Sequence, residues 1–327
     1  MTSMIRVGIV GYGNLGRGVE QSVAQQNDME LVGVFSRRDP KTVETVYETT
    51  NVYAMDDILS FQDQVDVLVL CGGSKDDLPV QTPQLAKHFN VVDSFDNHAE
   101  IPNHFETVGK EVSETTAIIS TGWDPGLFSL QRVMMEAILP VGESYTFWGK
   151  GLSQGHSDAV RRVEGVKNGV QYTIPSEPSI ERIRNGELVE LSTREKHVRE
   201  CYVVLEEGAD AKAVEEAIVT MPNYFEPYDT TVHFITEEEL QRDHQAMPHG
   251  GFVIRGGKTG RDETSQVMEF SLKLDSNPEF TASALVAYAR AAARLAKEGD
   301  YGVKTVYDIA PKYIARKSNE AMRRDDL

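Results

Sequence analysis

Short apolar runs alternate with longer mixed segments through the first third of the chain. Each run is rich in β-branched residues and is followed by a segment long enough for a helix, as where buried strands are linked by helices. The first such segment, residues 14–26, carries Leu15, Val19 and Val23 at helical spacing. The pattern predicts an α/β fold with a doubly wound parallel sheet, whose strands are Ile5–Val10, Leu31–Phe35, Val65–Cys71, Val91–Asp93 and Ala117–Thr121.

The pattern of apolar and polar residues changes near Tyr145, where longer segments in which the two alternate begin. Such alternation is typical of antiparallel strands with one solvated face. The pair Asn277-Pro278 then opens an alanine-rich helix, Thr281–Glu298, whose apolar face is expected to pack back on the first domain. We predict one domain of residues 1–123 plus about 276–327, and a second α+β domain of about 124–275 with a mixed or antiparallel sheet. Its predicted strands include Val170–Ile174, His197–Leu205, Thr230–Ile235 and Val267–Leu274.

The first apolar run leads directly into a glycine pattern, Gly11-x-Gly13-x-x-Gly16. Gly11 permits the tight turn, Gly13 lets the backbone approach a phosphate, and Gly16 lets the following helix pack on the strand. A strand before the pattern and a helix after it are the context in which it binds a dinucleotide pyrophosphate, in a Rossmann-type sheet. A glycine-rich turn without a ligand is the alternative.

The residues after the second predicted strand bear on which nucleotide is bound. An NAD site usually has an Asp or Glu there, whereas this chain has Ser36-Arg37-Arg38. A guanidinium can form two parallel hydrogen bonds with a 2′-phosphate, and a serine adds a hydroxyl donor. NADP is therefore favoured over NAD. The alternative is a solvated loop in which Asp39 serves NAD.

Composition narrows the choice of partners. The chain has 327 residues, with 33 basic against 51 acidic side chains and a net charge of −18, which argues against nucleic acid and anionic membrane as partners. Its two cysteines, Cys71 and Cys201, follow no metal or redox spacing and fit a reducing cytoplasm. No signal peptide or membrane-length apolar run is evident. We expect a cytoplasmic enzyme with a small-molecule substrate and no metal.

Three polar loops follow predicted strands, at the sheet edge where ligands bind in such folds. They are residues 72–74, 94–98 and 122–126, and the last two contain Asp96 and Asp124. A carboxylate in a closed site can hold an ammonium group, accept its proton and orient water. Two structural alternatives stay open: Asp96 caps the helix that starts near His98, and Asp124 initiates a turn with Pro125.

Eight phrases spread over nearly the whole chain resemble those of the meso-diaminopimelate dehydrogenases. The resemblance implies a homodimer whose second domain binds substrate and dimerises. It also implies NADP-dependent oxidation of the D-centre of meso-2,6-diaminopimelate to L-2-amino-6-oxopimelate, ammonia and NADPH, a reversible reaction of lysine and cell-wall metabolism. The phrases are Val10–Gly16, Phe35–Arg38, Phe95–His98, Ser120–Gly126, Thr146–Gly149, Gly151–Asp158, Met247–Gly251 and Leu272–Asp275.

The resemblance also assigns residues to roles. Asp96 and Asp124 are the implied catalytic pair. The implied substrate-binding residues are Asp96, Asp124, Trp148, Gln154, Gly155, Thr173, Arg199, His249 and Asn277. The expected cofactor-binding residues are Gly11, Tyr12, Gly13, Asn14, Leu15, Ser36, Arg37, Arg38, Cys71, Gly72, Gly73, Ser74, Ser94, Phe95, Asp96, Thr121, Gly122, Trp123, Asp124 and Pro125.

Alternatives remain for several of these residues. Trp148 is a core residue or faces a cleft, because strand alternation sends it and Phe147 to opposite faces. Arg199 binds a substrate carboxylate or is a surface strand arginine, and Asn277 binds substrate or caps a helix. His249 with nearby His244 lacks the spacing of a helical zinc pair. For the whole chain, the rivals are another NADP-dependent amino-acid dehydrogenase and a non-catalytic NADP-binding sensor.

Overall fold

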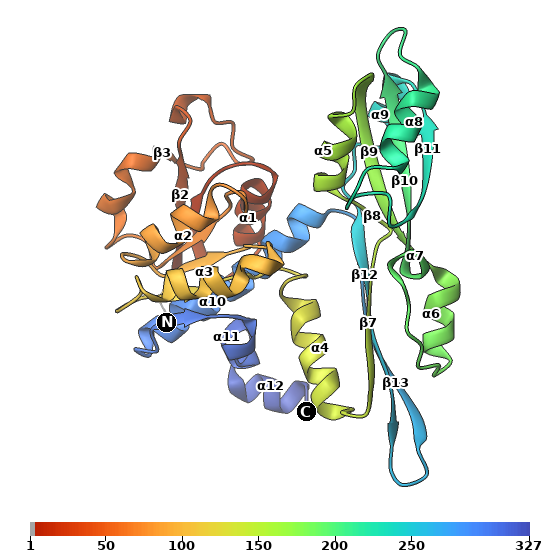
Figure 1. The fold of residues 1–327 in the computed structure, drawn as a ribbon. Helices are drawn as coiled ribbons and strands as arrows, with labels where there is room; N and C mark the ends of the chain where they lie inside the picture. Colours follow the sequence, from red (N-terminus) through yellow and green to blue (C-terminus); the bar gives the residue numbers. More distant parts are fainter. Residues whose placement is uncertain (1–3) are drawn as a thin grey trace. The chain divides into compact units, whose positions relative to one another are not determined.

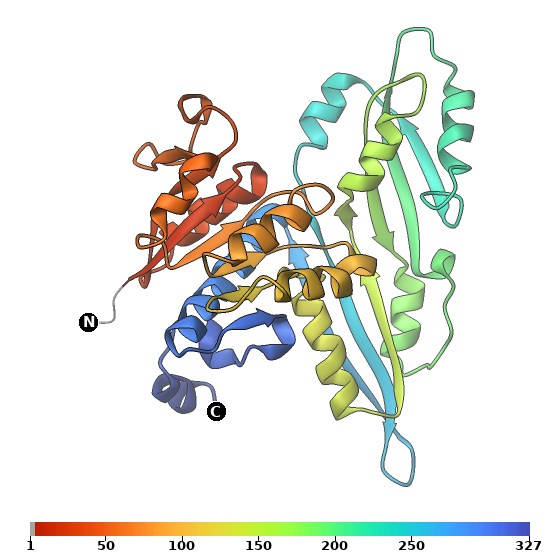
Figure 2. The ribbon, with the colours of Figure 1, turned by 60° about the vertical axis from the view of Figure 1, so that its left-hand side comes forward.

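The computed structural model describes residues 4–327, and the chain divides into two compact units. Unit 1 consists of the chain up to Leu130 together with Pro278–Leu327, and unit 2 of Gln131–Asn277. Figures 1 and 2 show that the C-terminal segment, coloured blue, belongs with the red and orange N-terminal part.

A seven-stranded sheet in the order β14-β6-β5-β4-β1-β2-β3 forms the centre of unit 1, and all its strand pairs are parallel. The predicted doubly wound sheet is confirmed. The pattern missed β3 and β14, which have only three residues each. The strands are β1 (Ile5–Val10), β2 (Met29–Ser36), β3 (Val52–Ala54), β4 (Val67–Leu70), β5 (Val91–Asp93), β6 (Thr116–Ile118) and β14 (Gly302–Lys304).

Helices cover both faces of this sheet, because its strands carry apolar side chains on both sides. On one face, Val7 and Ile9 of β1 share a buried cluster with Val19 of α1 and Leu285 of α10. On the other face, Leu68 and Leu70 of β4 share a buried cluster with Leu78 and Leu85 of α2. The helices of unit 1 are α1 (Asn14–Ala24), α2 (Leu78–Ala86), α3 (Ile101–Gly109), α10 (Asn277–Lys297), α11 (Pro311–Ile314) and α12 (Asn319–Asp325), with α10 beginning at the last residue of unit 2.

The alanine-rich helix packs as the sequence predicts. Leu285, Ala289 and Leu295 of α10 are buried in the same cluster as α1. The two helices approach so closely that a Cβ on Gly18 would lie 2.9 Å from the Cβ of Ala282. A helix more than 250 residues away from β1 in the sequence therefore completes the core around this strand.

Unit 2 contains two sheets, where the sequence predicted a single mixed or antiparallel sheet. One has the order β11-β10-β9-β8 and the other β13-β12-β7. β10 and β11 are parallel, because α8 (Ala211–Val219) lies between them in the chain and acts as a crossover. The strands are β7 (Gly142–Trp148), β8 (Gly151–Leu152), β9 (Val166–Pro175), β10 (His197–Leu205), β11 (Asp229–Phe234), β12 (His249–Thr259) and β13 (Thr264–Leu274).

Each sheet of unit 2 buries one face against helices. Val160 of α5 and Val214 of α8 pack against Val203 of β10. Ile180 of α6 packs against Phe147 of β7 in a separate cluster. The remaining helices are α4 (Leu127–Ile138), which begins in unit 1, and α5 (Gln154–Arg161), α6 (Glu177–Arg184), α7 (Thr193–Lys196) and α9 (Glu237–Asp243). No helix within residues 4–327 is both long and apolar enough to span a bilayer.

Candidate active site

The glycine turn of unit 1 has the geometry of a dinucleotide cradle. Gly11 has a φ of +86°, which favours glycine, and a Cβ on Gly16 would lie 2.4 Å from the carbonyl oxygen of Gly11. Around Gly13, by contrast, a Cβ would meet nothing within 4 Å. Gly13 is also the N-cap of α1 and provides no side-chain cap, so first-turn N–H groups are left for an anion. Asn14 and Leu15 open the helix at this point.

The loop after β2 lies beside that turn. Arg38 donates from its guanidinium to the carbonyl of Tyr12 and from its backbone N–H to the hydroxyl of Ser36 (3.0 Å). Arg37 is exposed and forms an ion pair with Asp77 (2.7 Å). The Arg38 guanidinium therefore borders the glycine turn, whereas the Arg37 guanidinium lies against Asp77 at the start of α2.

A buried carboxylate that sequence reasoning missed fixes the neighbouring loop. Glu20 of α1 is 1% exposed and accepts hydrogen bonds from the hydroxyls of Tyr12 and Thr50 and from the N–H of Tyr47 (3.2 Å). Burial and this bond to Glu20 raise the pKa of Tyr12 to about 12. The Tyr12 hydroxyl thus bonds to Glu20 and to the N–H of Val46, and only the ring and backbone of Tyr12 are available to a cofactor.

The three polar loops follow β4, β5 and β6, which are neighbours in the parallel sheet. Their residues therefore emerge at one edge, the carboxyl edge. Asp96 is exposed and its N–H is bonded to the hydroxyl of Ser74 (3.1 Å), which joins two of the loops. Asp124 is half-buried in a tight turn closed by a bridge between Trp123 and Gly126.

The structure distinguishes between the alternatives for these two residues. The short helix that starts at His98 has Asn97 as its N-cap, so Asp96 does not cap it. Asp124 does lie in a turn with Pro125. The other expected cofactor residues on this edge are Cys71, Gly72, Gly73, Ser94, Phe95, Thr121 and Gly122, which occupy the same three loops.

In unit 2, Trp148 ends β7 and is 39% exposed, whereas Phe147 is fully buried. The opposite orientation of the two rings agrees with strand alternation. The indole stacks on the ring of His197, with centroids 5.5 Å apart, and the backbone N–H of Trp148 donates to His197 Nε2 (2.9 Å). His197, which the sequence did not single out, thus holds the Trp148 face in place.

Gln154 and Gly155 form the first turn of α5 rather than a flexible glycine loop. Ser153 is the N-cap and its hydroxyl bonds to His156 Nδ1 (2.8 Å) instead of capping the helix. First-turn N–H groups of a helix have no partner within the helix and attract anions. A Cβ on Gly155 would meet nothing within 4 Å, so this helix end is open to a ligand.

Thr173 and Arg199 face each other across β9 and β10, and the Arg199 guanidinium donates to the Thr173 hydroxyl. Arg199 is only 6% exposed, which excludes a surface arginine. Its guanidinium carbon lies 3.9 Å from the centre of the Tyr228 ring, and its Nε has no hydrogen-bond partner. A buried cation without a carboxylate among the described residues is a site for an anion.

His249 extends the same cluster. It begins β12, and a Cβ on Gly151 would lie 2.5 Å from its ring; Gly151 in turn pairs with Thr173 between β8 and β9. Thr173, Arg199 and His249 are therefore contiguous within unit 2. The ring of His244, by contrast, bonds to the Tyr172 hydroxyl (3.0 Å).

Asn277 is joined to the Gln154 side of unit 2. Its backbone N–H donates to the carbonyl of Met247 (2.9 Å), and the Met247 sulfur accepts from the Gln154 amide (3.7 Å). Asn277 is the first residue of α10, as the pair Asn277-Pro278 predicts, and not its N-cap.

The charge of Arg199 influences two histidines beside it. Burial, with a further effect of Arg199, lowers the pKa of His156 to about 4. The same causes, with Lys196, lower the pKa of His197 to about 4. Both rings are therefore neutral at pH 7. A sequence signal existed for His197, because it is two positions from Arg199 on the same face of a strand.

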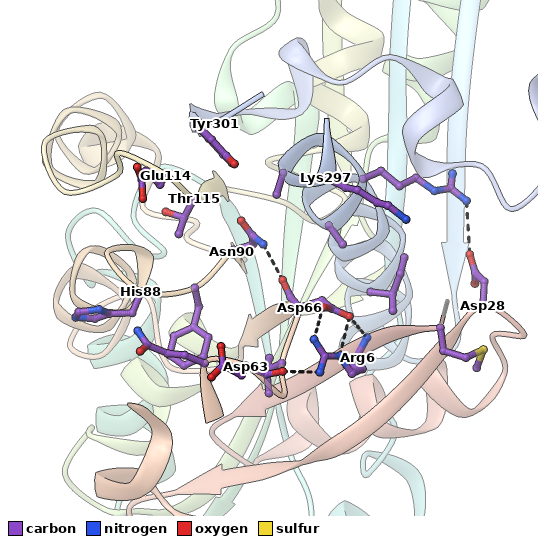
Figure 3. A pocket seen from close by; sticks show the side chains of 18 residues that line it. Arg6, Asp28, Asp63, Asp66, His88, Asn90, Glu114, Thr115, Lys297 and Tyr301 are labelled. Atoms are coloured by element: carbon purple, nitrogen blue, oxygen red, sulfur yellow. Dashed lines mark hydrogen bonds and ion pairs between the residues drawn. The ribbon is translucent and has the colours of Figure 1, made fainter. Parts of the chain in front are cut away.

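A cavity of about 690 Å³ lies at the opposite, amino edge of the unit 1 sheet (Figure 3). Its polar groups pair among themselves: Arg6 with Asp66 (2.8 Å), and Asn90 with the Asp66 carbonyl (2.8 Å). Because ligands of doubly wound sheets bind at the carboxyl edge, this cavity does not alter the location of the candidate site.

Comparison with known proteins decides the family. Residues 122–276 match the family model described as the diaminopimelic acid dehydrogenase C-terminal domain. The curated meso-diaminopimelate D-dehydrogenase of Ureibacillus thermosphaericus is 62% identical over 327 residues, covering 99% of this chain and 100% of that protein. The chain belongs to the meso-diaminopimelate D-dehydrogenase family. It is accordingly an oxidoreductase that acts on a CH–NH2 group with a nicotinamide cofactor.

Relatives more distant than that dehydrogenase agree with this assignment. The Corynebacterium glutamicum meso-diaminopimelate D-dehydrogenase is 47% identical, with 95% of each chain covered. The solved structure of C. glutamicum DAP dehydrogenase in complex with DAP has a TM-score of 0.91 at 46% identity and covers 100% of both chains. An engineered D-amino acid dehydrogenase bound to NADP+ has a TM-score of 0.85 at 44% identity, covering 99% of this chain and 100% of that one.

Proposed function

We propose that this dehydrogenase oxidises the D-configured carbon of meso-2,6-diaminopimelate with NADP+ and water, giving L-2-amino-6-oxopimelate, ammonia and NADPH. The observation that carries the proposal is the full-length identity of 62% to a curated meso-diaminopimelate D-dehydrogenase. The reaction class fits the side chains at the carboxyl edge of unit 1, which include two carboxylates, Asp96 and Asp124.

NADP is the proposed cofactor. A pyrophosphate is proposed to bind in the Gly11–Gly16 turn at the N-terminus of α1. The space beside Gly13 is open, because this residue has no Cβ and no atom of the protein beyond its chain neighbours lies within 4 Å of where a Cβ would be. Arg37 and Arg38 supply positive charge beside the same turn, in a chain whose net charge is −18. When bound, the cofactor supplies the acceptor for the hydride that leaves the substrate carbon.

Asp96 and Asp124 are the proposed catalytic residues at the D-centre. Oxidation requires a neutral amine, so a carboxylate must hold the ammonium and receive its proton, and a water molecule must then be oriented toward the imine carbon. Because the two residues follow neighbouring strands, both roles can be met at one edge of the sheet. The backbone N–H groups of Gln154 and Gly155, at the N-terminus of α5, are assigned to the carboxylate of the D-centre.

The distal L-centre is assigned to Thr173, Arg199, His249 and Asn277, with Trp148 against the substrate chain. Arg199 is the group that binds the distal carboxylate, because it is a buried guanidinium that has no carboxylate partner in residues 4–327. A substrate with a charged group at each end would use both sets of residues, those assigned to the D-centre and those assigned to the distal L-centre. A sensor that binds only NADP has no use for this second set.

We also propose a homodimer. Four apolar side chains are exposed on and just after α4: Val133 (49%), Met134 (46%) and Ile138 (63%) in the helix, and Val141 (65%) beyond its end. An exposed apolar stripe of this kind is typical of a protein interface. It supports the dimer that the family resemblance implies.

The test is reduction of NADP followed at the nicotinamide absorbance band with the meso-, LL- and DD-isomers of diaminopimelate. We expect turnover of the meso-isomer and none of the LL-isomer, because only a D-centre presents its hydrogen to the cofactor once amine and carboxylate are fixed. Asp124→Asn should lower kcat far more than it weakens NADP binding. Equal turnover of the LL- and meso-isomers would contradict the proposal.

A further inference from the structure

Asp93, the last residue of β5, is a carboxylate with no exposed surface and four donors around it. Its Oδ2 accepts from the hydroxyl of Thr82 on α2 and from Nε2 of His104 on α3, both at 2.8 Å. Because a carboxylate only accepts, the His104 ring carries its proton on Nε2. These two side chains come from helices on either side of β5 in the chain.

The other oxygen of Asp93 binds the backbone of two loops. Oδ1 accepts from the N–H of Phe95 (3.1 Å) and from the N–H of Ser120 (2.8 Å). The backbone carbonyl of Asp93 accepts in addition from the N–H of Thr121 (2.9 Å). One residue therefore anchors both the loop that carries Asp96 and the loop that carries Asp124.

The two anchoring points lie close to the candidate catalytic residues in the chain. Phe95 immediately precedes Asp96, and its ring stacks on that of His104 with centroids 4.2 Å apart. Ser120 has a φ of +55°, a conformation that a residue with a side chain adopts only when its surroundings impose it. In this conformation the N–H of Ser120 donates to Asp93.

We propose that Asp93 is a positioning residue for the dehydrogenase reaction and that Thr82 and His104 orient its carboxylate. Asp93 touches neither substrate nor cofactor in this scheme. It sets the position of Asp96 relative to Asp124 by holding both loops with one rigid group. The inference deepens the proposed function and rests on the assignment of those two carboxylates to the D-centre.

The test uses pairs of variants that differ in one donor. His104→Gln keeps an N–H donor near Nε2, and His104→Leu removes it; Thr82→Ser keeps a hydroxyl, and Thr82→Val removes it. We expect kcat for meso-diaminopimelate to fall roughly 10–100-fold in the variants without the donor, because misplacement of about 1 Å costs catalysis that much. The donor-keeping variants should retain most of kcat, with a KM for NADP within about twofold of the wild type. The variants without the donor should also show a raised KM for NADP, because the same two loops carry expected cofactor-binding residues.

A matched control separates positioning from loss of stability. Val67→Ala shortens a fully buried side chain at the start of β4, a strand that leads into neither loop, and it should lower the thermal midpoint with little change in kcat. The proposal is overturned if Val67→Ala lowers kcat as much as His104→Leu does at a similar midpoint. It is also overturned if His104→Leu and His104→Gln have equal kcat.

Hydrogen exchange supplies a readout that does not need activity. Peptides covering residues 94–98 and 119–126 should exchange several-fold faster in His104→Leu than in the wild type, and at the wild-type rate in His104→Gln. Unchanged exchange in His104→Leu would overturn the proposal. If the wild type fails to oxidise meso-diaminopimelate, the proposed function fails, whereas the exchange comparison still decides whether Asp93 holds the two loops.

Discussion

Arg199 shows how much a single residue decides in this enzyme. A guanidinium that is 6% exposed, stacked on Tyr228 and bonded to Thr173 has lost most of its hydration without gaining a carboxylate among the described residues. A substrate carboxylate restores that balance, and an apolar substrate end does not. We therefore expect the site around this residue to favour a substrate with a second charged end.

Removing the polar groups of the distal cluster should redirect the enzyme. In the triple variant Thr173→Val, Arg199→Met, His249→Leu, each lost contact should cost roughly 1–3 kcal/mol of affinity for diaminopimelate. Simple apolar D-amino acids should become better substrates, because the hydride leaves from the other end. The measurement is kcat/KM for meso-diaminopimelate and for an apolar D-amino acid.

The matched control for this prediction is Arg194→Met. Arg194 is an exposed arginine shortly before β10 that pairs with Asp229, so its removal should leave the ratio of the two kcat/KM values unchanged. Loss of both activities in a folded triple variant would mean that these residues do more than hold the distal end.

Arg37 and Arg38 should determine the choice of cofactor. Replacing both with alanine should raise the KM for NADP roughly 10-fold or more, since a hydrogen bond to a charged group is worth about 1.5–3 kcal/mol. The KM for NAD should stay nearly constant, because NAD has no 2′-phosphate. Lys41→Ala is the control, as it removes a nearby positive charge on the exposed turn Pro40–Thr42. An unchanged KM for NADP in the double variant contradicts the assignment of this loop.

His156 and His197 should make the folded state less stable in acid. Their pKa values are lowered to about 4 in the folded protein, against about 6.5 for a histidine in an unfolded chain. Between these values the unfolded state binds more protons, so their contribution is complete above about pH 6.5 and is lost as the pH falls toward 4. The expected loss is on the order of 2–3 kcal/mol for each ring.

The check is the urea midpoint of unfolding measured between pH 4 and 8. His197→Gln keeps an acceptor for the Trp148 N–H without titrating, so its midpoint should fall less steeply in acid than that of the wild type. If the urea midpoint of His197→Gln fell with pH as steeply as that of the wild type, the lowered pKa of His197 would not contribute to the loss of stability in acid.

At the scale of the element, two glycines of the turn between β1 and α1 have different functions: Gly16 allows the helix to pack on the strand, and Gly13 leaves space for a ligand. Gly16→Ala places a Cβ 2.4 Å from the Gly11 carbonyl oxygen and must push α1 away from the strand. Gly13→Ala meets no protein atom within 4 Å and disturbs only what binds there. We expect the first variant to lose both thermal stability and NADP affinity, and the second to lose NADP affinity alone.

Thermal unfolding with and without NADP measures both quantities in one experiment. The wild-type midpoint should rise with NADP, and the Gly13→Ala midpoint should start at the wild-type value and rise less. If Gly13→Ala shows the full wild-type increase, the pyrophosphate does not bind at this turn.

At the scale of the whole molecule, the α4 stripe predicts self-association. Sedimentation should show a dimer, and Ile138→Glu should shift the protein toward monomer because it places a charge among Val133, Met134 and Val141. Leu59→Glu is the control, since Leu59 is 50% exposed in unit 1 and lies away from this stripe in the chain. A monomeric wild type, or equal dissociation of both variants, would exclude this interface.

Much of unit 1 could be predicted from the sequence, because its information is local. Strands buried on both faces appear as apolar runs, and a tight turn at a helix N-terminus requires glycines at fixed spacing. The doubly wound parallel sheet and the packing of α10 follow from these patterns. The same local reasoning also identified the loops of Asp96 and Asp124, because strand ends of a parallel sheet share one edge.

Only the tertiary structure decided which distant residues meet. The links from Asp93 to Thr82, His104 and Ser120, and from Arg199 to Thr173 and Tyr228, join segments whose sequences carry no mark of one another. The division of unit 2 into two sheets likewise depends on which strands pair with each other, and the alternation of apolar and polar residues along a strand does not specify this. The sequence alone therefore determined the parallel sheet of unit 1 apart from β3 and β14, the glycine turn after β1 and the family. The environment that buries a carboxylate or a guanidinium exists only after folding, because burial and hydrogen bonding depend on atoms supplied by other parts of the chain.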